Sequence, residues 1–371
     1  MDKEHPKTKR RRRRLPPAKI AAALVLLAVC AGLLYAYLHP DSLRALQRRE
    51  GGQDLFTYEA GSGQTFAVAG NALAVASSTG IQLIDADGET ILRKIFSMDE
   101  PAVAACGDRA VFYDVGGTTL RVAELDGSYT TQDTDAAILS VTLNGEGYMA
   151  VSTEETGYKG LVTIYDPQME AVYRWHSGEG YLLKAEVSPD SAGFAALTLA
   201  STGGRIQFFS LGEEEPLSTY EAADTLLLDM KYCGDRVCAL SETGMLFLDD
   251  DGALAGSFDF GGESLVDYHL GTGNFAAVCL SEYRAGGICR MVTLDGRGNV
   301  LAQQEIRQDL VGLDIRDRQL LLQYSDTLEL YDRRLSLRGT ASGVLGIQRA
   351  LLRDRGDALL LRAYSAELCQ F

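Results

Sequence analysis

A unit of three short strands separated by fixed turns recurs along most of this 371-residue chain. Residues 68–88, 104–127 and 231–252 each show a strand, a Gly-Asn or Gly-Asp turn, a second strand, a glycine-containing turn, a third strand and an Asp-Gly turn. Weaker copies cover residues 143–166, 186–210, 270–296, 315–332 and 352–371. No segment after residue 54 keeps a helical period, so the pattern predicts an all-β chain.

The spacing of the copies indicates how the strands are arranged. The third strand of the first seven copies ends at Asp85, Glu124, Asp166, Ser210, Asp249, Asp295 and Asp332, a mean spacing of about 41 residues. A four-stranded blade of a β-propeller takes about 40 to 50 residues. We therefore expect residues 54–371 to form one propeller of eight blades, or of seven if the last copy pairs differently.

The two ends of the repeat region complement each other. The eighth copy stops at its third strand, at Phe371, and an unassigned segment, 54–60, precedes the first copy. Pairing these two ends would complete one blade and remove two open strand edges, which otherwise favour aggregation. We expect the ring to close through this pairing.

Residues 20–38 form an uncharged apolar run of 19 residues. As a helix this run is about 28 Å long, close to the ~30 Å hydrocarbon core of a bilayer. Nine cations precede it, and positive flanks stay in the cytoplasm. The sequence thus predicts a single-pass cell-membrane protein with a cytoplasmic head (1–19), a transmembrane helix (20–38), a short stalk (39–53) and an extracytoplasmic propeller.

Two other interpretations of the apolar run also imply export. A lipoprotein signal ending at Cys30 needs a small residue before the cysteine, and Val29 occupies that position. A cleaved signal peptide has an apolar region of only about 7 to 15 residues and a small-residue cleavage site, which this run lacks. An uncleaved anchor fits better than either.

Charge argues against nucleic-acid binding. Residues 1–50 carry 12 basic and 4 acidic side chains, which leaves 23 basic and 47 acidic ones, a net charge of −24, from residue 51 onward. Such a body repels phosphate backbones. We interpret the basic run 9–14 as a topology signal that contacts anionic lipid headgroups.

The strand-and-turn layout, with Ser188-Pro189-Asp190 at one turn, resembles the WD40-like and quinoprotein-like propellers. It is more similar still to an uncharacterised Firmicute family of membrane-tethered propellers, a domain of unknown function. Ser191 replaces the glycine of the usual Ser-Pro-Asp-Gly turn, and Trp-Asp dipeptides are absent. The resemblance implies a shape and a cellular place but no chemistry.

No catalytic, cofactor-binding or metal-binding residue can be assigned from the sequence. After residue 50 the histidines are His176 and His269, in different repeats, and a metal site would need both to meet. We expect instead a turn residue after Trp175 and a strand residue beside Tyr268. A Gly-x-Ser-x-Gly nucleophile elbow is absent, and a single tryptophan cannot supply a quinoprotein's docking motifs. A glycosidase carboxylate pair cannot be singled out among 47 acidic residues.

Two acidic segments could be read as calcium ligands. Residues 85–88 (Asp-Ala-Asp-Gly) and 249–252 (Asp-Asp-Asp-Gly) place carboxylates before a glycine, but neither has the distal glutamate of an EF-hand loop. Both occur where the repeat requires a hairpin turn with positive φ angles. We interpret both as turns, and we expect no cofactor.

Six cysteines lie outside the apolar run: Cys106, Cys233, Cys238, Cys279, Cys289 and Cys369. A domain of this size does not need disulfides for stability. In the repeat alignment, Cys238 matches Val111 and Ala74, and Cys279 matches Ala239, which suggests core positions. Cys279 and Cys289 flank one hairpin and are the best candidate pair, although the alignment places Cys279 opposite Leu294. Whether any bridge forms stays open.

These observations predict a non-enzymatic binding or scaffold module of the cell envelope, whose partner is an envelope protein or a glycan. One alternative is an extracellular carboxylate-based glycosidase or lyase. Another is a ligand sensor that works through a membrane partner, because 19 cytoplasmic residues cannot hold a signalling domain.

Overall fold

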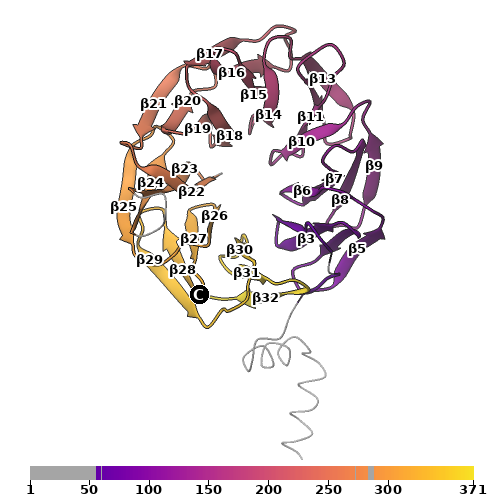
Figure 1. The fold of residues 1–371 in the computed structure, drawn as a ribbon. Helices are drawn as coiled ribbons and strands as arrows, with labels where there is room; N and C mark the ends of the chain where they lie inside the picture. The colour runs from indigo at the N-terminus through magenta and orange to yellow at the C-terminus, as the bar shows by residue number, and fades with distance from the viewer. Residues whose placement is uncertain (1–55, 60, 272, 283–287) are drawn as a thin grey trace, which may run out of the picture. The chain divides into compact units, whose positions relative to one another are not determined.

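The computed structural model describes residues 56–59, 61–271, 273–282 and 288–371. The expected cytoplasmic head, transmembrane helix and stalk lie outside these residues. The described residues form eight four-stranded antiparallel sheets arranged as the blades of a ring, which confirms the expected all-β, eight-bladed propeller. Figure 1 shows the first strand of the blades nearest the centre and the fourth strand at the periphery.

The first four blades follow the order of the chain. Blade 1 is β2 (Thr65–Ala69), β3 (Ala72–Ser77), β4 (Gly80–Ile84) and β5 (Thr90–Ile95). Blade 2 is β6 (Pro101–Cys106), β7 (Arg109–Asp114), β8 (Thr119–Glu124) and β9 (Tyr129–Asp133). Blade 3 is β10 (Ile138–Leu143), β11 (Met149–Thr153), β12 (Leu161–Tyr165) and β13 (Ala171–His176). Blade 4 is β14 (Tyr181–Val187), β15 (Gly193–Ala200), β16 (Gly203–Ser210) and β17 (Ser218–Ala223).

The next three blades continue in the same way, and the eighth takes its outer strand from the beginning of the ring. Blade 5 is β18 (Leu227–Cys233), β19 (Arg236–Ser241), β20 (Gly244–Leu248) and β21 (Leu254–Asp259). Blade 6 is β22 (Ser264–Leu270), β23 (Phe275–Ser281), β24 (Cys289–Asp295) and β25 (Val300–Ile306). Blade 7 is β26 (Gly312–Arg316), β27 (Gln319–Gln323), β28 (Thr327–Asp332) and β29 (Leu337–Ser342). Blade 8 is β30 (Arg349–Leu352), β31 (Ala358–Leu361), β32 (Ser365–Cys369) and β1 (Phe56–Thr57).

The core consists of apolar clusters between neighbouring blades. Both faces of a blade's middle strands are covered by other blades, so β3, β11, β12, β23 and β31 are buried along their whole length. Outer strands such as β5 and β13 instead expose most of their residues. This division explains why the second and third strands of each repeat are the most apolar segments of the chain.

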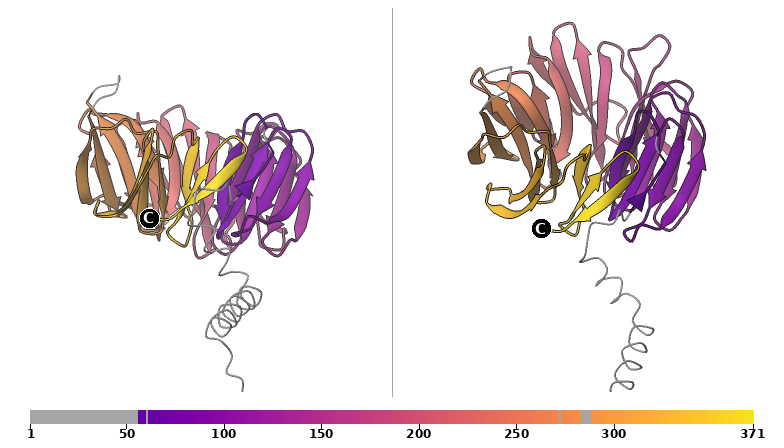
Figure 2. Two further views of the ribbon diagram at one scale, coloured as in Figure 1. Left: turned by 90° about the horizontal axis from the view of Figure 1, so that it is seen from below. Right: turned by 60° about the horizontal axis from the view of Figure 1, so that its bottom comes forward.

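The ring closes through β1 and β32. Phe56 pairs with Ala366 and Thr57 with Ser365, and the Tyr58 N–H donates to the Tyr364 carbonyl over 2.9 Å. The side chain of Phe56 is fully buried in the cluster of the last blade. Figure 2 shows this last blade, in yellow, beside the indigo first blade. The strand is shorter than the segment 54–60 that the sequence offered for this pairing.

Each innermost strand begins at one face of the ring, here called the entry face, and ends at the other, the exit face. At the exit face the turns between first and second strands touch the turn of the next blade. A Cβ atom on Gly273 would overlap the Asp317 carbonyl, and one on Gly234 would overlap Asn274. Glycine is therefore required where these turns approach each other.

The turn at residues 188–191 departs from the usual propeller sequence. Ser191 adopts a φ of 59°, the left-handed conformation that glycine adopts without cost. Its hydroxyl accepts a hydrogen bond of 2.7 Å from the Asn144 side chain in the preceding blade. This inter-blade bond offsets part of the backbone strain and gives serine a structural role here.

Candidate functional site

The innermost strands of blades 3 to 6 share an irregularity that, among the described residues, the innermost strands of the other blades do not show. In β10, β14, β18 and β22 the pairing register shifts near the start of the strand. The shift skips one residue in each strand: Leu139, Leu183, Leu228 and Val266. A bulged residue has no partner in the ladder, so its side chain is free to leave the plane of the sheet.

These bulges place apolar side chains around the axis of the ring. The exposed fraction is 39% for Leu183, 44% for Leu228 and 48% for Val266. Val311, just before the innermost strand of blade 7, is 53% exposed. Because innermost strands of neighbouring blades contact each other around the ring, their exposed side chains face the axis. We call Leu139, Leu183, Leu228, Val266 and Val311 the apolar collar; it lies toward the entry face.

A layer of ionisable side chains lies directly below the collar, and in blades 4, 5 and 6 it starts at the residue that follows the bulge: Lys184, Asp229 and Asp267. The ammonium of Lys184 is 2.9 Å from Asp229 and 3.1 Å from Glu186, and it also donates to the Met230 carbonyl over 2.9 Å. Burial disfavours the charge of Lys184, but the two carboxylates outweigh this effect and raise its pKa. Lys184 therefore stays protonated and links blade 4 to blade 5.

Tyr268 and Asp267 extend this layer into blade 6. The Tyr268 hydroxyl donates to Asp229 over 3.1 Å, and burial together with this carboxylate raises the pKa of Tyr268 to about 12. Asp267 accepts the N–H of Tyr268, as Asp229 accepts that of Met230 at the equivalent bulge. Burial raises the pKa of Asp267 in spite of that bond and of the nearby His269 and Arg349.

His269 completes the layer on the side of blade 7. Its Nε2 atom lies 3.2 Å from a carboxylate oxygen of Asp314, whose other oxygen accepts the Leu352 N–H over 2.7 Å. The Nδ1 atom of His269 is buried and finds no hydrogen-bond partner among the residues that the structure describes. We call Lys184, Glu186, Asp229, Asp267 and Asp314 the charged layer; Tyr268 and His269 connect its members.

The two histidines noted in the sequence do not come together. His176 ends β13, the outer strand of blade 3, where it contacts the Tyr158 ring at 4.8 Å. The expectation that His176 is a turn residue was therefore wrong. His176 pairs with Leu161, and the strand extends through it. His269 lies on the innermost strand of blade 6. Within the described residues, no three His, Cys, Asp or Glu side chains are grouped to hold a metal ion.

Both acidic segments form the turn between the third and fourth strands of a blade. Gly88 and Gly252 adopt φ angles of 90° and 80°. Asp85 accepts the N–H groups of Asp87 and Glu89, each over 2.9 Å. In the second segment Asp249 accepts from Arg236 over 2.8 Å. The leading carboxylate of each segment thus bonds to protein donors, as the turn interpretation requires.

Five of the six cysteines are buried and Cys106 is partly buried, but two details of the alignment were wrong. Cys279 lies opposite Met291 instead of Leu294, and its equivalent in blade 5 is Leu240 instead of Ala239. Cys279 and Cys289 are within hydrogen-bonding distance as thiols, and burial followed by this neighbour raises the pKa of Cys279. Cys233 and Cys238 form a similar contact in blade 5.

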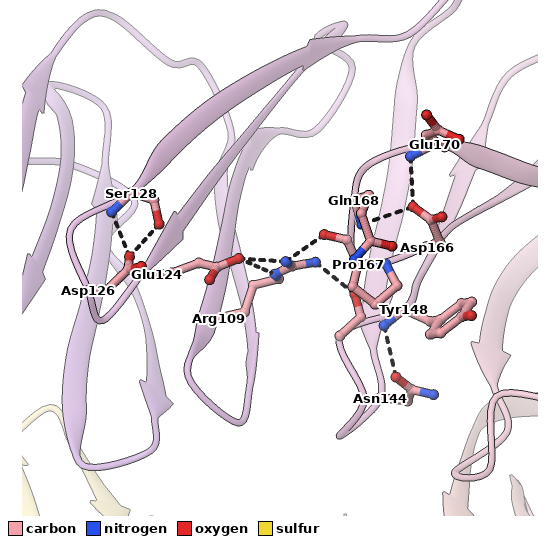
Figure 3. A network of polar contacts seen from close by, with 11 residues as sticks. Arg109, Glu124, Asp126, Ser128, Asn144, Tyr148, Asp166, Pro167, Gln168 and Glu170 are labelled. Atoms are coloured by element: carbon pink, nitrogen blue, oxygen red, sulfur yellow. Dashed lines mark hydrogen bonds and ion pairs between the residues drawn. The ribbon is translucent and has the colours of Figure 1, made fainter.

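Figure 3 shows a polar network with a purely structural role. Arg109, at the start of β7, pairs with Glu124 of its own blade and donates to the carbonyls of Gly147 and Pro167 in the next blade, each over 2.8 Å. Arg353 does the same between blades 8 and 1, on Asn71 and Ala86. Such arginines tie adjacent blades together at the exit face.

Neither the apolar collar nor the charged layer was predicted, although the sequence carries a signal for both. Each bulged strand begins with two consecutive apolar residues, such as Leu227-Leu228 and Leu265-Val266, followed by a polar one. A regular strand with one polar face would alternate. The doublet marks the bulge, and the residue after it marks the start of the charged layer.

The fold defines the protein as an eight-bladed β-propeller. The chain belongs to the DUF5711 family, a family of unknown function, whose model matches residues 55–340. No curated protein matches the chain in sequence. Among the described residues no helix has the length and apolar character to cross a membrane.

Solved propellers share the fold at low identity. The computationally designed Ika8 protein has a TM-score of 0.64 at 13% identity, covering 86% of this chain and 100% of that one. The C-terminal WD40 domain of Sif2 has a TM-score of 0.60 at 13% identity, covering 86% and 98%. BamB from Moraxella catarrhalis has a TM-score of 0.55 at 13% identity, covering 83% and 96%. These similarities concern the fold alone.

Proposed function

We propose that this protein is a membrane-anchored, extracytoplasmic binding module of the cell envelope, whose propeller docks a segment of a partner protein at the apolar collar. The anchor and the location are supported by the uncharged run 20–38 and by the cations that precede it. The docking role is supported by the axial arrangement described above. No chemical step is part of this proposal.

The apolar collar is the observation that carries the proposal. Its members expose 39% to 53% of their surface, except Leu139, which is partly buried, although all of them lie on or directly beside the innermost strands. The feature is repeated at equivalent positions of consecutive blades, so it is not a single misplaced side chain. Contiguous exposed apolar surface of this kind marks interaction sites in soluble domains.

The charged layer indicates the chemistry of the occupant. The layer contains four carboxylates and one ammonium, and Arg349 of blade 8 lies close to Asp267. Residues 51–306 carry 13 basic and 38 acidic side chains, so the surrounding blades attract cations at long range. We expect a segment with apolar side chains for the collar and at least one Lys or Arg that reaches the carboxylates.

Photo-cross-linking in intact cells tests this docking role. A benzophenone amino acid replaces Leu228 of the collar in one variant and Leu254 in the control. Both are leucines of blade 5 with 44% and 51% exposure, but Leu254 lies on the outer strand. We expect the probe at 228 to capture a basic and apolar protein segment in clear excess over the probe at 254. Leu183→Asp should abolish that capture.

Three outcomes would contradict the proposal. Equal capture at both positions would mean that the collar is not a preferred surface. Capture of an acidic segment would exclude the role given to the charged layer. Capture of polysaccharide alone would favour a glycan as the ligand.

The raised pKa of Asp267 is the one observation that favours the enzymatic alternative. A carboxyl group that keeps its proton at higher pH can act as a general acid, and Asp229 and Asp314 on neighbouring strands could supply the second carboxylate. The full-length protein in detergent, incubated with purified cell-wall glycan, tests this. Release of reducing ends by the wild type but not by Asp267→Asn would establish the glycosidase; we expect no release.

A further inference from the structure

A hollow on the exit face lies at the opposite end of the innermost strands from the collar. Its volume is about 540 Å³, and it is lined by the turns 273–274, 317–319 and 354–356 of blades 6, 7 and 8 and by Arg333. This size suits a small molecule or the head of a larger one. We call it the arginine pocket, because three guanidinium groups line it: Arg318, Arg333 and Arg355.

These three arginines differ from most others in the structure. Most other arginines of the described residues are paired with carboxylates, as in Arg109–Glu124 and Arg353–Asp357. Within the described part of the chain, Arg318, Arg333 and Arg355 form no ion pair. They come from three turns of two adjacent blades, so the packing of blade 7 against blade 8 brings them together.

Two carboxylates also line the pocket, but they do not cancel its charge. Asp354 is already paired with Arg316 at the rim. Asp317 forms no ion pair among the described residues, and its backbone adopts a φ of 53°. With Asp354 already neutralised, the three arginines and the single carboxylate of Asp317 give the pocket a net excess of positive charge.

The blades around the pocket share this excess. Residues 307–371 carry ten arginines and nine acidic residues, a net charge of +1, whereas residues 51–306 have a net charge of −25. An anion is thus repelled by most of the ring and meets the least acidic part of it at blades 7 and 8. The electrostatic field of the ring and the guanidinium groups of the arginine pocket thus both favour anion binding at blades 7 and 8.

We propose that the arginine pocket binds a phosphate group carried by a small molecule or by a lipid head. A guanidinium presents a planar fork of N–H donors that matches phosphate oxygens, and charge-assisted bonds of this kind are about twice as strong as neutral ones. Arg318 and Arg355 lie in the turns of blades 7 and 8, so one phosphate can bridge the two blades. This site is independent of the apolar collar at the opposite face.

The test uses the full-length protein in neutral detergent, with binding followed by ³¹P line broadening. The probes are glycerol phosphate, as a free phosphorylated molecule, and dihexanoylphosphatidylglycerol, as a lipid head, with dihexanoylphosphatidylcholine as the zwitterionic reference. We expect saturable binding that Arg318→Gln/Arg355→Gln weakens about tenfold. Binding of either the free or the lipid phosphate with this dependence supports the proposal and identifies the source.

Arg334→Gln is the matched control. Arg334 lies next to Arg333 in the same turn, is exposed and does not line the pocket. The basic run 9–14 is present in every variant, so its own affinity for phosphate cancels in the comparison. Equal loss in Arg334→Gln, or no loss in the double variant, would overturn the proposal. Thermal unfolding should be unchanged in all variants, because none of these arginines forms an ion pair.

Discussion

Asp229 accepts hydrogen bonds from three donors on blades 4, 5 and 6. Its oxygens take the Lys184 ammonium at 2.9 Å, the Met230 N–H at 2.8 Å and the Tyr268 hydroxyl at 3.1 Å. Asp229→Ala removes one acceptor from each of the three donors, so we expect the free energy of unfolding to fall by about 2 kcal/mol. Urea denaturation of the full-length protein measures this.

The exposed pair of Arg307 and Glu305, at 2.9 Å, provides the comparison. Glu305→Ala should cost less than about 0.5 kcal/mol, because water screens an exposed pair. Similar losses in the two variants would show that the charged layer contributes no more to stability than a surface ion pair.

Asp267 should make stability depend on pH in a recognisable direction. Burial raises the pKa of its carboxyl above the value in the unfolded chain. The protonated carboxyl therefore favours the folded state below the pKa of the unfolded chain, near 3.9. This contribution to stability is lost as the pH rises through the pKa of the folded protein. Asp267→Asn removes the penalty, so its melting temperature relative to wild type should rise between pH 4 and pH 7.

The control for this titration is Asp309→Asn, at an exposed aspartate. Its melting temperature relative to wild type should not change with pH. A flat difference for Asp267→Asn as well would show that Asp267 is ionised without cost in the folded protein.

At the scale of strands and turns, the short strand β1 should be disproportionately important. Phe56 is fully buried in the apolar cluster shared by blades 8 and 1, whereas its neighbour Thr57 is exposed. Removing a buried phenyl ring costs about 3 to 5 kcal/mol. We expect Phe56→Ala to lower the melting temperature strongly and Thr57→Ala to leave it nearly unchanged.

Limited proteolysis gives an independent measurement for the same pair of variants. Opening of the closure should expose the β32 region first, so Phe56→Ala should be cleaved near residues 365–369. Equal resistance of the two variants would contradict the structural role of β1.

Strands and turns also show what the sequence could and could not predict. The turns recur because Gly-Asp, Asp-Gly and Gly-Asn pairs tolerate positive φ, so blade number and strand order were visible. The register of β23 could not be predicted, because this strand is buried on both faces. No alternation of apolar and polar residues therefore fixes which residues pair across the ladder. The bulge at Leu228 was missed because the repeat alignment assumed regular strands.

The arginine pocket could not be predicted from local sequence at all. Arg318 and Arg355 are 37 positions apart and meet only because adjacent blades stack around the ring. The available signal was the net charge of residues 307–371, which is +1, whereas residues 51–306 together have a net charge of −25.

For the molecule as a whole, the orientation in the membrane is the prediction with the widest consequence. The proposal places residues 1–19 in the cytoplasm and the propeller outside. In intact cells, a membrane-impermeant maleimide should label Thr156→Cys, at an exposed position between β11 and β12. Thr8→Cys, in the head, should be labelled only after lysis. The reverse pattern would refute the proposed location.

The closure at β1 has a mechanical consequence. In the proposed anchored arrangement, a pull on the propeller would reach β1 first. Among the described residues, β1 pairs with β32 through Phe56–Ala366 and Thr57–Ser365, and the Tyr58 N–H bond to the Tyr364 carbonyl follows these pairs. Tension would peel these two pairs apart before it reached any sheet with longer strands. Blade 8 would then lose its outer strand while blades 1 to 7 kept all four of theirs. In that arrangement we expect the ring to open first at this closure, because β1 is the shortest strand among the described residues.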